Sequence, residues 1–212
     1  MKFVKKTIAL TIIVVMAFLL FGCAENHELK NLDVLTAMGI DKQDEKFEIY
    51  AQVLKSAEAT SDSLADSYRY FIGAGDDFVE AVDSVYAQGS GELTFSHNKL
   101  YLFSLSAVSN KEELKEILLN STYDIRPQSY CVIVKNKMDY FVTAADDYGY
   151  DCNYKLLEIL KNEENAPTVN DILLALNNGK KNIMIPVVEV DKGIVSIESW
   201  LTVNDLGIGT KF

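Results

Sequence analysis

The chain is short, acidic and apolar enough to form a folded core. It has 212 residues and a formal net charge of −11, and 49% of its residues are hydrophobic. This charge disfavours nucleic acid and anionic bilayer surfaces as binding partners. The length suits one large domain or two small ones, and the low number of prolines, three, argues against a long disordered segment.

The first 22 residues have the layout of an export signal. Three lysines among the first six residues precede an uncharged run over 7–22, as in secretory signals. The run is shorter than the roughly 20 residues of a spanning helix, so an uncleaved membrane anchor is the weaker interpretation. It ends in Leu-Phe-Gly-Cys, which is similar to the bacterial lipobox. We therefore expect residues 1–22 to be a lipoprotein signal peptide, Cys23 to carry the lipid and residues 23–31 to be a short tether.

The first part of the chain after the tether, up to Gly89, is predicted to contain three strands and one helix. Residues 47–54 alternate between apolar and polar side chains, the pattern of a half-buried strand. A polar turn over 41–46 joins this strand to the one before it, which predicts an antiparallel hairpin. Asp76 is the expected N-cap of the helix that follows. The predicted elements are strands over 34–40, 47–54 and 68–72, a loop over 55–67, and a helix that begins after Gly75 and ends before Gly89.

The rest of the chain alternates between helices and strands. Ser109 followed by Glu112 predicts a capping box at the start of one helix, and Thr168 predicts the N-cap of another. A turn over 191–193 predicts a second hairpin. The predicted strands are 99–105, 130–134, 182–190, 194–203 and 208–212, and the predicted helices begin at Ser109 and cover 137–146, 153–163 and 168–177.

This order of elements predicts an α/β (α+β) fold with a mixed β-sheet flanked by helices, behind the signal peptide. The alternation of helices and strands in the middle favours parallel neighbouring strands, and the hairpins at both ends add antiparallel ones. Residues 130–134 are apolar enough for a central strand. We assign residues 32–212 to this folded region.

Two cysteines besides Cys23 leave a disulfide open as an alternative. An extracytoplasmic location permits a bond between Cys131 and Cys152. Cys131 lies within an apolar strand pattern, however, which suits a buried free thiol better. The sequence contains no cysteine and histidine spacing typical of a zinc site, and we predict neither a metal nor a cofactor.

Two groups of polar residues have the right chemistry for a site but a simpler structural explanation. Adjacent residues of a strand point to opposite faces, so Ser96 and His97 at the entrance of a strand would not form a catalytic pair. The acids Asp146, Asp147 and Asp151 would allow calcium binding, but they suit a solvated turn better. We therefore predict no catalytic residues and no enzymatic activity.

Two further groups are weaker still as binding sites. Gly73 and Gly75 precede a helix, as glycines do in phosphate-binding turns, but a third glycine and a basic residue are missing from the pattern. Tyr148, Tyr150 and Tyr154 would form either a binding surface or the edge of the core. The sequence does not decide between these two interpretations of the tyrosines.

Five segments, in order and behind the lipobox, resemble one known family. Gly-Ile-Asp-Lys at 39–42, the Phe-Ser-His segment within 93–100, the Arg-Pro turn at 124–127 and the strand at 130–134 are similar to segments of the spore germination C-subunit lipoproteins, the GerAC family. The start of the mature chain at 23–29 also resembles that of the family, with an alanine in place of the usual tryptophan. The resemblance extends over nearly the whole chain.

The resemblance implies a function in spore germination. Members of this family are lipid-anchored subunits of nutrient germinant receptors, on the outer face of the spore inner membrane, and they act by contact with integral membrane A-type and B-type subunits. Members commonly continue into a further C-terminal domain, which we expect to be missing from this chain. The alternative is a solute-binding lipoprotein of a transporter, a class that usually has two domains around a cleft.

Overall fold

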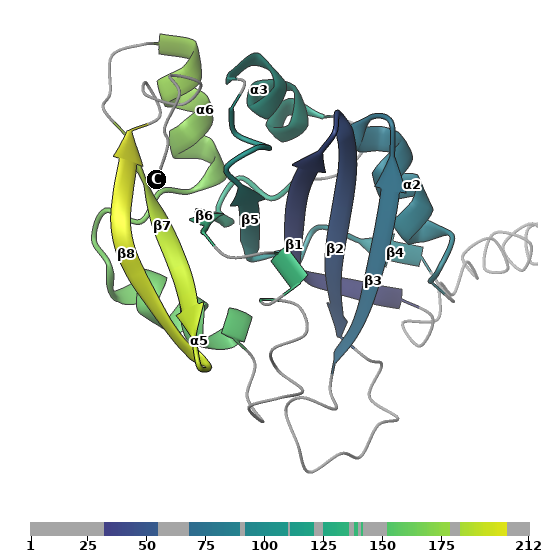
Figure 1. Ribbon diagram of the computed structural model, residues 1–212, viewed down its shortest axis with the longest axis horizontal. Coiled ribbons are helices and arrows are strands. Elements are labelled where there is room, and N and C mark those ends of the chain that lie inside the picture. The colour runs from purple at the N-terminus through teal and green to yellow at the C-terminus, as the bar shows by residue number, and fades with distance from the viewer. Residues whose placement is uncertain are drawn as a thin grey trace, which may run out of the picture.

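A mixed sheet of eight strands forms the centre of the molecule (Figure 1). The structure is a computed structural model, which describes residues 32–54, 68–89, 92–109, 111–120, 125–135, 138–139, 141, 152–178 and 183–202. Seven strands follow one another in the order β3 (Tyr68–Gly75), β2 (Lys46–Leu54), β1 (Leu32–Gln43), β5 (Leu100–Ser104), β6 (Tyr130–Val134), β7 (Met184–Asp191) and β8 (Ile194–Thr202), and the short β4 (Glu92–Thr94) pairs with β1.

The middle of the sheet is parallel and its two ends are antiparallel. Strands β1, β5, β6 and β7 run in the same direction. The hairpin β1–β2 with β3 extends one side, and the hairpin β7–β8 extends the other. Both hairpin turns have two residues with positive φ, Asp44 and Glu45 in the first and Lys192 and Gly193 in the second, and such turns match the twist of the paired strands.

Helices cover both faces of the sheet and divide the core into two layers. The buried residues of α2 (Phe78–Tyr86), α3 (Lys111–Leu119) and α6 (Val169–Asn178) join one apolar cluster on one face. Those of α5 (Cys152–Asn162) join a second cluster on the other face, together with Met138 and Phe141. None of the helices within the described residues is long and apolar enough to cross a membrane.

A β-bulge at Thr36 changes which side chains of β1 face each layer. The pairing with β2 skips this residue, since Leu35 pairs with Val53 and Ala37 pairs with Gln52. Leu35 therefore faces the layer of α2 and α3, whereas Ala37 two residues later faces the layer of α5. A bulge also bends a strand. Strand β1 pairs with β4 before the bulge and with β5 after it.

The predicted fold class is confirmed, with differences in detail. Strand β4 was not predicted, and β3 extends to Gly75. The N-cap of α2 is Asp77, whose side chain accepts from the backbone N–H of Glu80, and not Asp76. Thr168 caps α6 as predicted, with a reciprocal pair of bonds to Asp171.

Other predictions fall partly or wholly outside the described residues. The predicted cap of α3 at Ser109 is wrong, because the helix begins two residues later at Lys111 and the Ser109 hydroxyl donates to the carbonyl of Ser106. Most of the predicted helix over 137–146 and the whole predicted strand over 208–212 lie outside the described residues, as do the signal peptide, the tether and Cys23.

Candidate functional site

The end of β1 carries a buried carboxylate that organises the surrounding turns. The side chain of Asp41, a residue 7% exposed, accepts from the backbone N–H of Lys42 at 2.8 Å, from Nε2 of Gln43 at 2.9 Å and from the hydroxyl of Ser106 at 3.3 Å. Burial alone would raise the pKa of this carboxyl, but hydrogen bonds from Ser104, Gln43, Lys42 and Ser106 outweigh burial, and the pKa is lowered from 3.8. Asp41 thus remains ionised and ties β1 to the turn after β5.

The next residue connects this network to a helix. Nζ of Lys42 lies 2.8 Å and 3.0 Å from the two carboxylate oxygens of Glu113 on α3, and 3.3 Å from Glu45. The same ammonium lies 5.3 Å from the centroid of the Phe47 ring, within the range of a cation–π contact. The hydrogen bond to Glu113 is the main cause of a raised pKa for Lys42. Lys42 therefore fixes α3 against the β1–β2 hairpin.

A surface hollow of about 190 Å³ lies where this hairpin, α2 and α3 meet. Its apolar lining is formed by two phenylalanines in edge contact, with ring centroids 6.3 Å apart, together with a valine and an isoleucine. Three carboxylates and one amide complete it. The lining residues are Phe47, Asp77, Phe78, Val79, Glu113, Glu116, Ile117 and Asn120.

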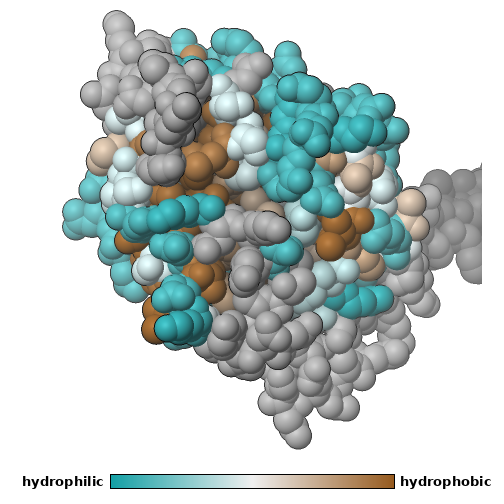
Figure 2. Space-filling view, in the orientation of Figure 1, coloured by the Kyte–Doolittle hydropathy of each residue, from teal (hydrophilic) through white to brown (hydrophobic). Residues whose placement is uncertain are grey.

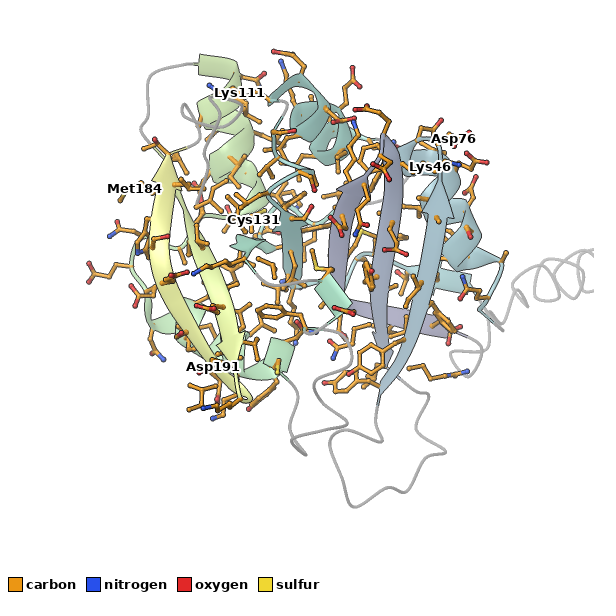
Figure 3. The ribbon with its side chains drawn as sticks, in the orientation of Figure 1. Lys46, Asp76, Lys111, Cys131, Met184 and Asp191 are labelled. Carbon is orange, nitrogen blue, oxygen red and sulfur yellow. The ribbon has the colours of Figure 1, made fainter. Side chains whose placement is uncertain are left out.

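The surroundings of the hollow are negatively charged and polar. Of its three carboxylates, Glu113 is neutralised by Lys42, whereas Asp77 and Glu116 are exposed. Figure 2 shows hydrophilic residues gathered over α3 and the neighbouring end of the hairpin. Lys46 and Asp76 lie together at the end of the sheet next to the hollow (Figure 3) and form a 3.1 Å ion pair. Lys46 is thus paired with Asp76, which is not a lining residue of the hollow.

The two walls of the hollow are held rigidly. The side chain of Asp77 accepts from the N–H of Glu80 at 2.8 Å, and the side chain of Glu80 accepts from the N–H of Asp76 at 2.7 Å, so the first turn of α2 is capped from both directions. Helix α2 also packs very close to β3. The approach is so close that a Cβ at Gly73 would lie 2.3 Å from the carbonyl oxygen of Ala81. Gly73 and Gly75 are therefore packing residues within a strand, and the interpretation as a phosphate-binding turn is wrong.

A second hollow, of about 230 Å³, lies beside the start of β7. It is lined by residues of the connection between α5 and α6 and by Ile183 and Met184, and Met184 marks that end of β7 in Figure 3. Its charged lining residues are Glu164 and Asp171, and Asp171 already receives two hydrogen bonds from Thr168.

The two internal cysteines are free and buried. Cys131 lies in the centre of the sheet (Figure 3) and faces the layer of α2, α3 and α6, whereas Cys152 is the first residue of α5 and belongs to the layer on the other face. The sheet therefore separates the two thiols, which excludes the disulfide alternative. Burial raises the pKa of the Cys131 thiol far above its usual value, as expected for a structural cysteine.

The segment that contains Ser96 and His97 differs from the prediction. Both residues are exposed and lie in a turn between β4 and β5, not in a strand, and the Ser96 hydroxyl bonds to Thr94 at 2.9 Å. A buried polar residue of this segment is Asn98, which is 0% exposed. Its carbonyl accepts from the hydroxyl of Ser129 at 2.7 Å, so it joins this turn to the start of β6. This contribution could not be predicted, because a single buried asparagine has no periodic signature in a sequence.

The remaining predicted site residues are dispersed or lie outside the described part. Tyr154 is 48% exposed on α5, and Tyr148, Tyr150, Asp146, Asp147 and Asp151 fall outside the described residues. Within the part of the chain that the structure describes, no group of three or more His, Cys, Asp or Glu residues is placed to hold a metal ion. The hollow beside α3 was missed by sequence reasoning, since its lining comes from β2, α2 and α3.

Comparison with known proteins supplies one match. Residues 25–190 match the family model described as the spore germination protein N-terminal domain. No curated protein and no solved structure matches the chain. The matched range begins two residues after Cys23 and contains every helix of the described structure and seven of its eight strands in full or nearly so.

Proposed function

The chain belongs to the spore germination protein family whose N-terminal domain it contains, and from this membership we propose that it is a lipid-anchored C-type subunit of a nutrient germinant receptor. In this proposal Cys23 carries the lipid on the outer face of the spore inner membrane. The domain then acts by contact with the A-type and B-type membrane subunits and not by catalysis. The observation that supports this most strongly is the family match over residues 25–190, directly behind a lipobox.

The anchor has a physical role in such an assembly. A lipid with two or more acyl chains anchors a protein stably, because each buried methylene contributes about 0.8 kcal/mol. Restriction to the membrane raises the effective concentration of the domain near its membrane partners. A weak contact is then sufficient for assembly, which suits a domain that offers small surface features and no large cleft among its described residues.

The solute-binding alternative is less well supported. Pockets for drug-sized ligands usually have about 300–1,000 Å³. The two hollows described above have about 190 and 230 Å³. Calorimetry with amino acids and sugars separates the two functions, because tight binding of a nutrient by the isolated protein would favour the solute-binding one.

Two genetic changes test the proposal. We expect deletion of the gene, in a strain without redundant receptors, to abolish the response of the spores to at least one nutrient. We expect Cys23→Ser to prevent incorporation of labelled palmitate, to release the protein from the membrane fraction and to reproduce the deletion. Normal germination of the deletion strain with every nutrient would contradict the proposed function.

A further inference from the structure

The hollow between α2 and α3 combines an apolar floor with a carboxylate rim. We propose that it is a docking site for one cationic side chain, arginine by preference, of a partner protein. The inference rests on the proposed function, since it supplies the contact by which the subunit would bind its membrane partners. It adds the place of that contact and the chemistry of the partner residue.

The size of the hollow fits a side chain and not a free ligand. Its volume of about 190 Å³ is below the roughly 300 Å³ at which pockets for drug-sized molecules begin. Protein interfaces concentrate their binding energy in a few side chains that enter such pockets, and arginine is enriched among them. A single long side chain from a neighbouring protein therefore fits the available space.

The charge of the rim selects a cation. Lys42 neutralises Glu113, but Asp77 and Glu116 are exposed at the rim. A backbone N–H at the start of a helix can bind an anion, but that of Glu80 in the first turn of α2 is already bonded to the side chain of Asp77. The carboxylates around it would also repel an anion. The rim therefore attracts Lys and Arg.

The floor favours a cation with a long apolar stem. Phe47 and Phe78 are 5% and 7% exposed, so they present only a small part of their rings to the hollow, beside the exposed Val79. The methylene groups of Arg can lie on such a surface while its head group remains at the rim. Its planar guanidinium can bind a carboxylate such as Glu116 with two parallel hydrogen bonds, which an ammonium cannot do.

The rigidity of the walls lowers the cost of binding. Helix α3 is fixed by the ion pair of Lys42 and Glu113, and α2 is fixed by its capping bonds and its close approach to Gly73 and Gly75. The hollow is thus formed before a partner arrives, and little conformational entropy is lost at the walls on association.

The test uses the full-length tagged lipoprotein in its own spores. Glu116→Lys reverses the rim charge, and Val79→Trp fills the hollow. Glu163→Lys makes the same charge reversal at an exposed position just after α5, and Ile194→Trp introduces the same indole at the exposed start of β8. The measurements are the germination rate and the amount of A-type and B-type subunits retained on the tagged protein after solubilisation in mild detergent, at equal lipoprotein levels in the membrane.

We expect each hollow variant to lower the retained subunits by about tenfold or more, and each control to stay close to wild type. If Glu116→Lys fails to accumulate, Glu116→Gln keeps the shape and should lower retention by about threefold, the scale of one partly exposed charge pair. A compensating change of one Arg to Glu in a membrane subunit should restore retention of the Glu116→Lys protein.

The outcomes separate the two proposals. Wild-type retention in both Glu116→Lys and Val79→Trp would overturn the docking site, even if deletion of the gene abolishes germination and the proposed function stands. Loss of retention in the control variants to the same extent would also overturn it, because the hollow would then have no special part in assembly. A deletion strain that germinates normally would instead remove the proposed function.

Discussion

Replacement of the buried carboxylate of Asp41 is expected to destabilise the fold. The carboxylate of Asp41 accepts hydrogen bonds from the backbone N–H of Lys42 at 2.8 Å and from Nε2 of the exposed Gln43 at 2.9 Å. In Asp41→Ala the Gln43 amide can turn to water, but the backbone N–H loses a charge-assisted bond. Such a bond contributes about 1.5–3 kcal/mol, and an orphaned buried donor costs about 1–3 kcal/mol. We therefore expect a loss of about 3 kcal/mol in the free energy of unfolding.

The stabilisation by Asp41 should depend on pH in a defined direction. Its pKa in the folded protein is lowered below the ordinary value of 3.8, so the folded state favours the ionised form. The contribution is therefore fully present well above pH 3.8 and is lost as the pH falls through the folded-state pKa. Asp41→Asn, which keeps the size and removes the charge, should be destabilised by about 2 kcal/mol at pH 7, and its difference from wild type should shrink below about pH 4.

Urea unfolding, followed by circular dichroism and by the fluorescence of the single tryptophan, Trp200, measures these differences at pH 7, 5 and 3.5. Asp44→Asn is the matched control, because Asp44 is an exposed acid in the same hairpin and asparagine tolerates its positive φ of 50°. A difference below about 0.5 kcal/mol for Asp41→Asn at pH 7, the range of ordinary surface substitutions, would refute the reasoning. So would a difference that stays constant down to pH 3.5.

Three further predictions follow from the packing and the turns. Gly73→Ala places a Cβ 2.3 Å from the carbonyl oxygen of Ala81, so thermal unfolding should show a loss of about 1–3 kcal/mol; an unchanged midpoint would contradict this close approach. The thiols of Cys131 and Cys152 are buried, and a maleimide should label them only after denaturation; rapid labelling of the native protein would contradict their burial. Lys192→Asn relieves a positive φ of 47° before Gly193, and the urea midpoint should rise by an amount equivalent to about 0.5 kcal/mol; a fall would show that Lys192 has another role.

The elements with a strong local pattern could be predicted from the sequence. Alternation over β2, the apolar run of β6 and the cap at Thr168 each depend on residues close in the chain, so local reasoning was sufficient. The three-residue β4 was missed because its pairing with β1 joins Leu32 to Glu92 across 60 positions. The sequence pattern predicted the N-cap of α2 at Asp76, one residue before the actual N-cap, Asp77. The two adjacent residues are both aspartates, and only the hydrogen bond from the N–H of Glu80 to Asp77 distinguishes them.

The candidate docking site could not be predicted in the same way. Glu113 and Glu116 look like ordinary solvated positions on an amphipathic helix, and Phe47 looks like an ordinary core residue of a strand. These residues line one hollow because the ion pair of Lys42 and Glu113 holds α3 against the hairpin, and because Gly73 and Gly75 allow α2 to pack close to β3. The segment at 39–42, known from the family resemblance alone, thereby acquires a structural reason: Gly39 leaves room for Met138, and Asp41 and Lys42 fix the wall of the hollow.

The length of the tether and the position of the hollow constrain how the domain meets its partner. In the proposed anchoring, residues 23–31 can span at most about 32 Å before β1 begins at Leu32, and the twelve residues of β1 add at most about 41 Å. The hollow lies at the far end of β1, next to Lys42 and Phe47. Its carboxylates would be repelled by an anionic bilayer surface. Repulsion of the carboxylates favours orientations in which the hollow faces away from the lipid. The docking proposal therefore predicts that the arginine belongs to a part of the receptor that projects from the membrane.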